Sequence, residues 1–201
     1  MVAARWITVF VGSGKTEFKL PADTLAHYSR FFKRAIDRPL SGDERDTILL
    51  PDICTEDFEI FVEFIFKRTL QDALTVEKWG DAIIERCVSF VVFAKELDLG
   101  PVDEAVYDLF KAALEKNGCE GFRPHHIENI FCSTSPESML RVLITKVALS
   151  MGAIHLGTYR NQETEVHGFA AELLRQIRLA DLSASWTDPL SGEKRTIGGD
   201  L

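Results

Sequence analysis

The chain has 201 residues, of which 46% are hydrophobic and 27% are charged, a composition typical of a globular protein. Its formal net charge of −8 at pH 7 argues against a phosphate-binding surface, so we expect no nucleic acid among its partners. No apolar run approaches the roughly 18 residues that span a bilayer, so we expect no membrane partner either. The apolar run Trp6–Val11 is not followed by a signal-peptide cleavage site and favours a strand.

The cysteine pattern favours a reducing compartment. Cys54, Cys87, Cys119 and Cys132 form no Cys-x-x-Cys pair. In a chain without a secretory signal, reduced and buried thiols are the expectation. The sequence therefore predicts an intracellular protein of the cytoplasm or the nucleus.

The first patterned segment predicts a β-hairpin followed by two short helices. β-Branched and aromatic residues at Ile7–Val11 and strand-type alternation at Thr16–Leu20 indicate two strands joined by a glycine turn. Apolar residues then recur at helical spacing, which predicts helices at Ala22–His27 and Ser29–Ile36. The second of these begins at Ser29, a good N-cap residue.

A third strand is expected at Thr47–Leu50, and a helix beginning at Thr55 follows it. The Thr55 hydroxyl suits an N-cap, and Glu56 and Asp57 lie in the first turn, where carboxylates favour the helix dipole. Apolar residues at helical spacing form one face, and Phe64 and Phe66 fall beside it, which predicts burial on more than one side. Since 11 of the 14 phenylalanines precede residue 111, we expect one aromatic core in the first half.

The rest of the chain has only helical patterns. Long helices are expected at Val76–Leu97 and Val102–Glu115, and a short one around Ile127. Ser135 is expected to cap another helix, with Pro136 at its first position. An amphipathic helix is expected at Thr164–Leu182, and from residue 183 the composition is that of a flexible tail.

The run Gly12–Thr16 ends like a phosphate-binding P-loop, which would make the protein a nucleotide-binding one. A P-loop has the pattern Gly-x-x-x-x-Gly-Lys-Ser/Thr, and its first glycine would fall at Val9 in this chain. A P-loop also needs a helix that begins after the lysine, whereas the residues after Lys15 have a strand pattern. We therefore expect a hairpin turn and keep nucleotide binding as a remote alternative.

Other reactive groups also favour structural roles. Cys119, His125, His126 and Cys132 match no compact zinc pattern, so we expect a loop thiol, two exposed histidines whose rings point apart, and a core cysteine. No Gly-x-Ser-x-Gly elbow is present. We therefore expect no catalytic residues, no metal and no cofactor, and we do not expect an enzyme.

A series of core positions follows the strands and helices in order over residues 5–116. Its main members are Phe18, Leu20, Leu25, Ser29, Phe31, Phe32, Leu50 and Phe58, and Ile48, Pro51, the helix end Phe64–Phe66 and the segment Ala94–Leu99 add to it. In this order and spacing, the series resembles the BTB/POZ family. Thr134, Ser138, Leu140 and Arg141 also resemble the helical extension of fungal-type BTB-only proteins. The resemblance implies an α+β fold, in which a sheet of three or more strands is capped by helices. It also implies an all-α extension at 122–182, before the tail at 183–201.

What the resemblance implies about function is an adaptor that binds other proteins. Family members dock on a cullin ubiquitin ligase, self-associate or hold transcription partners. We expect the first role, with a cullin or a second copy as partner. The alternative is a transcription-linked or self-associating scaffold without its own DNA contact. The candidate partner surface comprises Thr55, Glu56, Glu59, Glu63, Lys67 and Asp72.

Overall fold

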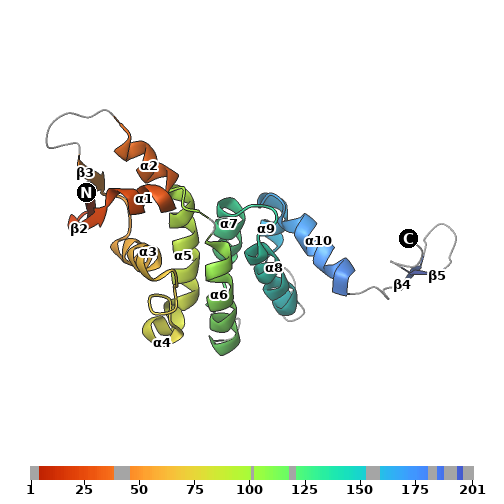
Figure 1. Cartoon of the computed structure of the whole chain (residues 1–201). Coiled ribbons are helices and arrows are strands. Elements are labelled where there is room, and N and C mark those ends of the chain that lie inside the picture. Colours follow the sequence, from red (N-terminus) through yellow and green to blue (C-terminus); the bar gives the residue numbers. More distant parts are fainter. Residues whose placement is uncertain are drawn as a thin grey trace. The chain divides into compact units, whose positions relative to one another are not determined.

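A computed structural model describes residues 5–38, 46–100, 102–117, 121–152, 159–180, 185–187 and 194–196. The chain forms two compact units, an N-terminal unit at Met1–Phe122 and a C-terminal unit at Arg123–Leu201. The fold is a mixture of helices and a small three-stranded sheet, in agreement with the predicted α+β class (Figure 1).

The sheet of the N-terminal unit has the strand order β2-β1-β3. Strands β1 (Trp6–Val11) and β2 (Thr16–Pro21) form the predicted antiparallel hairpin, and β3 (Thr47–Leu50) pairs in parallel with β1. Every second residue of β1, beginning with Ile7, is buried, so one face of the sheet lies on the core.

Helices α1 (Ala22–Tyr28) and α2 (Arg30–Ile36) meet at Ser29, which is the N-cap of α2 as predicted. Its buried hydroxyl accepts a hydrogen bond from the Phe32 N–H at 3.1 Å and donates one to the Leu97 carbonyl at 2.5 Å. Ser29 therefore fixes the corner between two helices and also joins that corner to a segment 68 residues away.

Phenylalanine rings from three helices form the predicted aromatic core. Phe58 and Phe61 lie on α3 (Thr55–Lys67), and their ring centroids are 6.3 and 5.9 Å from that of Phe32 on α2. Phe93, which follows later in the chain, lies 6.4 and 6.0 Å from the same two rings. All four rings are buried, so they hold α2, α3 and the helix of Phe93 together.

The residues that carry the family resemblance lie mostly in this core. Six are buried, namely Leu20, Leu25, Ser29, Phe32, Leu50 and Phe58. Phe18 and Phe31 are half-buried, and the Phe18 ring lies 4.8 Å from that of Phe58.

The single helix predicted at Val76–Leu97 is wrong. The structure has α4 (Val76–Trp79), a 3-10 helix η2 (Gly80–Ala82) and α5 (Ile83–Glu96). Gly80 has a φ of +52°, a left-handed conformation that interrupts an α-helix and that glycine adopts without steric cost. Helix α6 (Asp103–Asn117) then follows close to its predicted bounds.

Among the described residues of this unit, three that are not glycine have positive φ angles: Lys15 (51°), Arg68 (56°) and Asp98 (48°). Arg68 is the C-cap of α3, and Lys15 lies in the hairpin turn. The Asp98 carboxylate contacts the guanidinium groups of Arg30 and Arg34 at 3.1 and 3.2 Å.

The C-terminal unit contains α7 (Pro124–Ser133), α8 (Met139–Gly152), α9 (Arg160–Glu165) and α10 (Phe169–Ala180). Two short antiparallel strands, β4 (Ser185–Thr187) and β5 (Lys194–Thr196), lie within the predicted tail. The Phe131 and Phe169 rings, 5.4 Å apart, join α7 to α10.

Two helix predictions in this unit are wrong. Ser135 does not cap a helix, because its carbonyl accepts a hydrogen bond from the Ser138 N–H at 3.1 Å, and Pro136 occupies a position favoured in such a turn. The Ser138 hydroxyl instead accepts the Leu140 N–H at 3.2 Å. The helix predicted at Thr164–Leu182 is divided, because Gly168 has a φ of +87°.

We predict that Phe32→Ala lowers the free energy of unfolding by about 3–5 kcal/mol, because the substitution leaves a cavity among packed rings. Lys15→Ala is the control and should change it by less than about 0.5 kcal/mol, since Lys15 is exposed and both residues share the same backbone restriction. Urea denaturation measures both. A loss below about 1 kcal/mol for Phe32→Ala would contradict a core position.

Candidate protein-interaction surface

Helix α3 begins at Thr55, but its N-cap is Cys54 and not the predicted Thr55. The Cys54 thiol donates a hydrogen bond to Glu56 Oε2 at 2.8 Å. This bond is the main reason that the pKa of Glu56 lies below its ordinary value, and the Glu56 N–H and the Arg86 guanidinium lower it further. The first exposed carboxylate of α3 is thus kept ionised.

Five of the six predicted surface residues lie on α3, and the sixth, Asp72, forms an ion pair with Lys67 in the last turn of that helix. Glu56, Glu59 and Glu63 are three and four residues apart, a spacing that places them along one side of a helix. We call these three residues the acidic row. Glu56 and Glu59 are exposed and Glu63 is half-buried, as is Thr55.

Lys67 follows the acidic row as the last residue of α3. Its Nζ lies 3.3 Å from Glu63 Oε1 and 2.8 Å from Asp72 Oδ2. The hydrogen bond from Lys67 is the main cause of the lowered pKa of Asp72, and the charge of Lys67 adds to it. Glu63 and Asp72 thus share one ammonium group, whereas the exposed Glu56 and Glu59 lie nearer the start of α3.

Phe66 was predicted to be buried, and this prediction is wrong. Its side chain is 58% exposed, in the last turn of α3 and next to Lys67. The position of Phe66 off the apolar stripe, from which we predicted burial on a second side of the helix, fits exposure equally well. An exposed ring beside a row of carboxylates is a feature of protein-binding surfaces, which combine an aromatic anchor with a polar rim.

Beneath the acidic row, Asp57 points into the unit and binds α5. Its Oδ2 accepts a hydrogen bond from the Ser89 hydroxyl at 2.7 Å, and its Oδ1 lies 3.1 Å from the Arg86 guanidinium. Burial raises the pKa of the Asp57 carboxyl, while Ser89 and Arg86 oppose this effect. These contacts connect α3 to α5, so Asp57 supports the surface and does not belong to it.

Arg86, the partner of Asp57, also contacts Trp79. The Arg86 guanidinium lies 5.4 Å from the centre of the Trp79 ring, whose Nε1 donates to the Ala73 carbonyl at 2.5 Å. Trp79, Ala82, Glu85 and Arg86 line a pocket of about 240 Å³. Because Arg86 contacts both Asp57 and the indole, it is held in one orientation at this pocket.

Gly12–Thr16 forms the predicted hairpin turn. Gly12 has a φ of +73°, and a Cβ at this position would lie 2.9 Å from Thr55 Oγ1, so glycine is required there. The segment connects β1 to β2, whereas a P-loop connects a strand to a helix.

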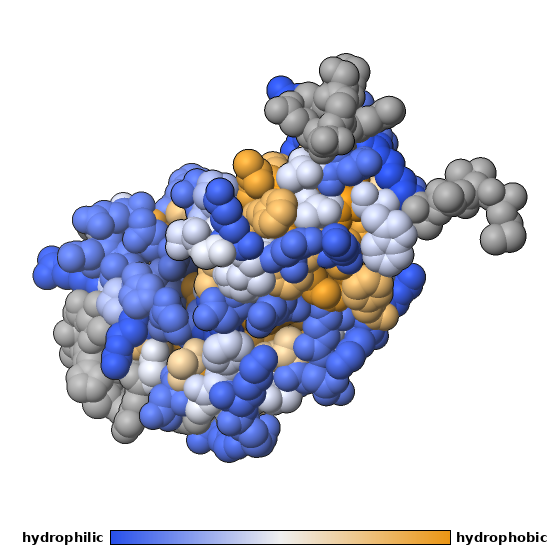
Figure 2. Space-filling model, turned by 90° about the vertical axis from the view of Figure 1, so that its left-hand side faces the viewer, coloured by the Kyte–Doolittle hydropathy of each residue, from blue (hydrophilic) through white to orange (hydrophobic). Residues whose placement is uncertain are grey.

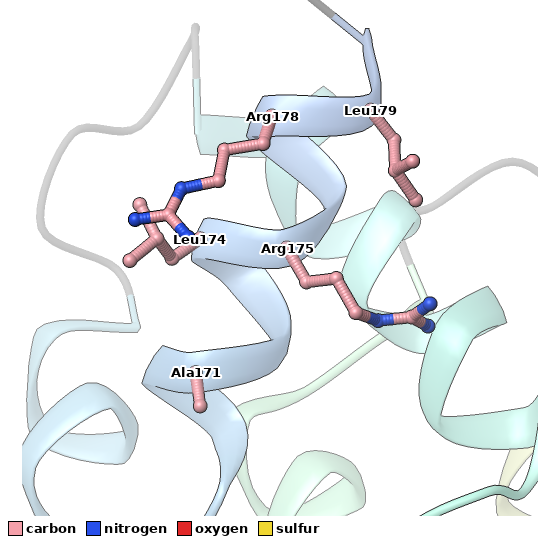
Figure 3. Close-up of a pocket in the computed structure, with 5 residues that line it drawn as sticks. All are labelled: Ala171, Leu174, Arg175, Arg178 and Leu179. Carbon is pink, nitrogen blue, oxygen red and sulfur yellow. The ribbon is translucent and has the colours of Figure 1, made fainter. Parts of the chain in front are cut away.

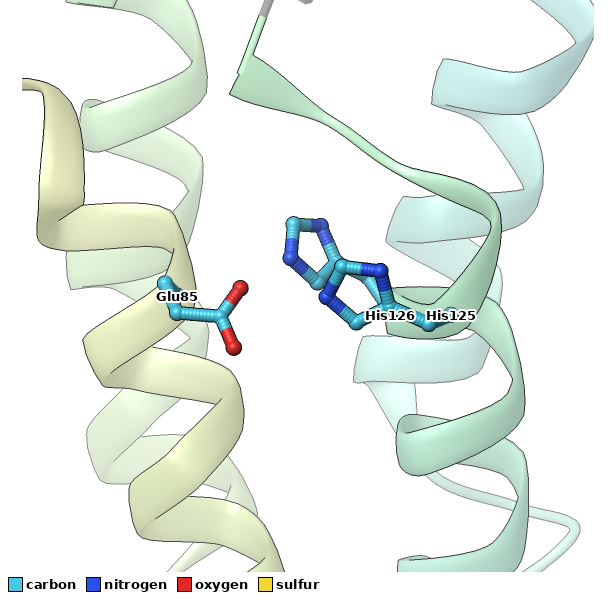
Figure 4. A group of neighbouring side chains, drawn as sticks. All are labelled: Glu85, His125 and His126. Atoms are coloured by element: carbon cyan, nitrogen blue, oxygen red, sulfur yellow. The ribbon is translucent and has the colours of Figure 1, made fainter.

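The Cys and His residues that we considered as metal ligands are placed differently from the prediction. His126 is buried, not exposed, and its ring centroid lies 4.2 Å from that of His125, so the rings do not point apart. Figure 4 shows both imidazoles at the start of α7; Glu85, drawn with them, belongs to α5 of the N-terminal unit. Cys132 is exposed and not a core residue, and Cys119 lies outside the described residues.

Of the two remaining cysteines, one is buried and one is exposed. Cys87 is buried as expected, and burial raises the pKa of its thiol to about 12. Cys54 is exposed, which contradicts the expectation of a buried thiol.

Three of the four residues that resemble a helical extension form the junction between α7 and α8, together with Phe131. Arg141 donates hydrogen bonds to the Phe131 carbonyl at 2.6 Å, to the Thr134 hydroxyl at 3.1 Å and to the Thr134 carbonyl. Its guanidinium also lies 4.8 Å from the centre of the Phe131 ring. Ser138 caps the start of α8 two residues before the buried Leu140. Arg141 thus satisfies carbonyl groups at the end of α7.

An apolar surface on α10 was not predicted. Leu174, Ile177 and Leu179 are each about half exposed or more. Ala171, Leu174, Arg175, Arg178 and Leu179 line an open pocket of about 420 Å³, and Figure 3 shows the two arginines on different sides of the helix.

Within the described residues, none of the helices combines the length and the apolar character needed to cross a membrane. A comparison with models of known protein families and with curated proteins finds no match to this chain.

The raised pKa of Asp57 predicts a pH dependence of stability. Below about pH 3.9, the ordinary Asp pKa, the carboxyl is protonated in both states, and its contribution to stability is complete. As the pH rises through the folded-state pKa this contribution is lost, because the folded state releases its proton later than the unfolded state. Relative to Asp57→Asn, which does not titrate, the wild type should therefore lose stability as the pH rises above the ordinary Asp pKa of about 3.9 and through the raised pKa of the folded state.

Urea denaturation at several pH values measures this difference. Ser89→Ala retains the carboxyl but removes a hydrogen bond that lowers its pKa, so it should steepen the loss. A wild type that instead gains stability over Asp57→Asn as the pH rises would show that Arg86 lowers the pKa of Asp57 overall.

Arg141→Lys should destabilise the C-terminal unit by about 1–3 kcal/mol, because an ammonium cannot replace the planar group that binds two carbonyls and a hydroxyl. Arg178→Lys, at an exposed position of α10, is the matched control and should change stability by less than about 0.5 kcal/mol. Thermal denaturation monitored by circular dichroism compares the two variants. Equal effects would contradict a capping role for Arg141.

Proposed function

We propose that the protein is an interaction module of the BTB/POZ type that links a partner protein to a cullin ubiquitin ligase inside the cell. The order β1-β2-α1-α2-β3-α3 agrees with the order on which the family resemblance rests. The buried positions of Ser29 and Phe32 at the α1–α2 corner add support, because the resemblance includes both residues.

The observation that carries this proposal is the surface of α3, where the exposed Phe66 lies beside the acidic row and Lys67. An exposed aromatic side chain supplies apolar area to a partner, and charges around it select partners with complementary charge. The Asp57–Ser89 hydrogen bond and the Asp57–Arg86 ion pair fix the helix that presents them. We infer that α3 binds a basic surface on the cullin.

The second candidate is a self-associating or transcription-linked scaffold that makes no DNA contact of its own. The edge strand β2 favours it, because exposed strand edges pair with other strands. We propose no catalytic activity, since the polar side chains of Asp57, Ser89 and Arg141 are engaged in contacts between helices.

The test is the affinity of purified cullin N-terminal domains for the whole chain, measured by isothermal titration calorimetry. Glu59→Lys should weaken binding at least about tenfold, because it reverses a charge in the acidic row. Glu115→Lys makes the same charge change on α6, where Glu115 is exposed, and should change affinity less than about twofold.

Absence of binding to every cullin domain would contradict the adaptor role. A stable homodimer in light scattering together with that absence would favour the scaffold. Equal effects of the two substitutions would exclude α3 as the contact surface.

A further inference from the structure

Strand β2 forms one edge of the three-stranded sheet, on the side of β1 away from β3 (Figure 1). Residues Ser13–Glu17 and Lys19 are exposed, and Phe18 is half-buried. Figure 2 faces the side of the N-terminal unit where β2 and β3 lie, and shows hydrophobic side chains in small groups between hydrophilic ones. An exposed strand edge offers backbone groups to another strand.

The direction of these backbone groups follows from the ladder. The Ala22 N–H donates to the Arg5 carbonyl at 2.9 Å, which makes this pair a hydrogen-bonded one. Hydrogen-bonded pairs alternate with non-hydrogen-bonded pairs along an antiparallel ladder. Glu17 and Lys19 fall in non-hydrogen-bonded pairs, with Phe10 and Thr8. The N–H and C=O groups of Glu17 and Lys19 therefore point away from β1.

Only the odd-numbered residues of β2 have backbone N–H and C=O groups that point away from β1. A second copy of β2 can therefore pair with it antiparallel in three registers, centred on residue 17, 18 or 19. A register centred on residue 17 places two Glu17 side chains opposite each other, and one centred on residue 19 does the same with Lys19. Both are unfavourable, because directly opposed like charges destabilise a ladder. A register centred on Phe18 instead places Glu17 opposite Lys19 twice.

We propose that β2 pairs with β2 of a second copy about a two-fold axis at Phe18. This inference rests on the proposed role as an interaction module and names one of its partners. The register forms hydrogen-bonded pairs between Glu17 and Lys19, while the two half-buried Phe18 rings face each other in the close, non-hydrogen-bonded pair. The contact is isologous, so it closes at a dimer.

The ends of β2 fit this register. Pro21 lacks an N–H, but it would lie opposite Lys15, whose φ of 51° places it in the turn and outside the strand. The missing donor therefore falls beyond the paired segment. A lysine on an edge strand normally disfavours pairing with other strands. Here the unfavourable charge of Lys19 is offset only by a strand that places a carboxylate directly opposite it, as Glu17 of the second copy does.

Charge exchange tests the register. Glu17 Oε1 and Lys19 Nζ lie 3.2 Å apart on the exposed face, so substitutions there leave the core intact. By symmetry each single substitution changes two cross-strand pairs. Glu17→Lys and Lys19→Glu should each weaken the dimer at least about tenfold, and the double variant E17K/K19E should restore it to within about twofold. Sedimentation equilibrium of the full chain measures these constants, with melting temperatures as the check of folding.

A wild-type chain that remains monomeric up to about 1 mM would overturn the proposal. A dimer that both single variants retain, or that the double variant does not restore, would also overturn it. Cullin binding by the same four proteins keeps the two proposals separate, because loss of the dimer with retained cullin binding refutes only the strand pairing.

Discussion

The N-terminal unit depends on the packing of four buried phenylalanine rings from α2, α3 and α5, which contact one another where these helices meet. The rings approach one another at tilted or edge-on angles, apart from the stacked pair Phe32 and Phe61. Ser29 positions Phe32 for this contact, since its hydroxyl caps α2 and binds the Leu97 carbonyl at the end of α5. The sheet can be small because the helices bury one another.

The fold was largely predictable where local patterns decide it. The three strands, α1, α2 and α6 begin and end within two residues of their predicted bounds. Two of the three errors in helix bounds lie where one backbone angle overrides a periodic apolar pattern: Gly80 divides the helix predicted at Val76–Leu97, and Gly168 divides the last helix. The third lies at Ser135, where a turn precedes the helix that this residue was expected to cap. Helical periodicity continues across both glycines, so it cannot indicate which of them adopts a left-handed conformation.

The candidate site was predictable in position but not in detail. The spacing of Glu56, Glu59 and Glu63 is sufficient to place them along α3. Whether a neighbouring side chain is exposed depends on which other elements cover the helix. This dependence explains the errors at Phe66 and Cys132, which are exposed, and at His126, which is buried. The contacts of Asp57 with Ser89 and Arg86 of α5 join residues 32 and 29 apart in sequence, so no local pattern reveals them.

The left-handed residues suggest a way to make the protein more heat-resistant for structural work. At the C-cap of α3, glycine in place of Arg68 would relieve steric strain, because such positions favour a residue without Cβ. The same exchange at Asp98 would be counterproductive, since it would remove the carboxylate that two arginines of α2 share. A positive φ therefore calls for opposite engineering choices at Arg68 and Asp98.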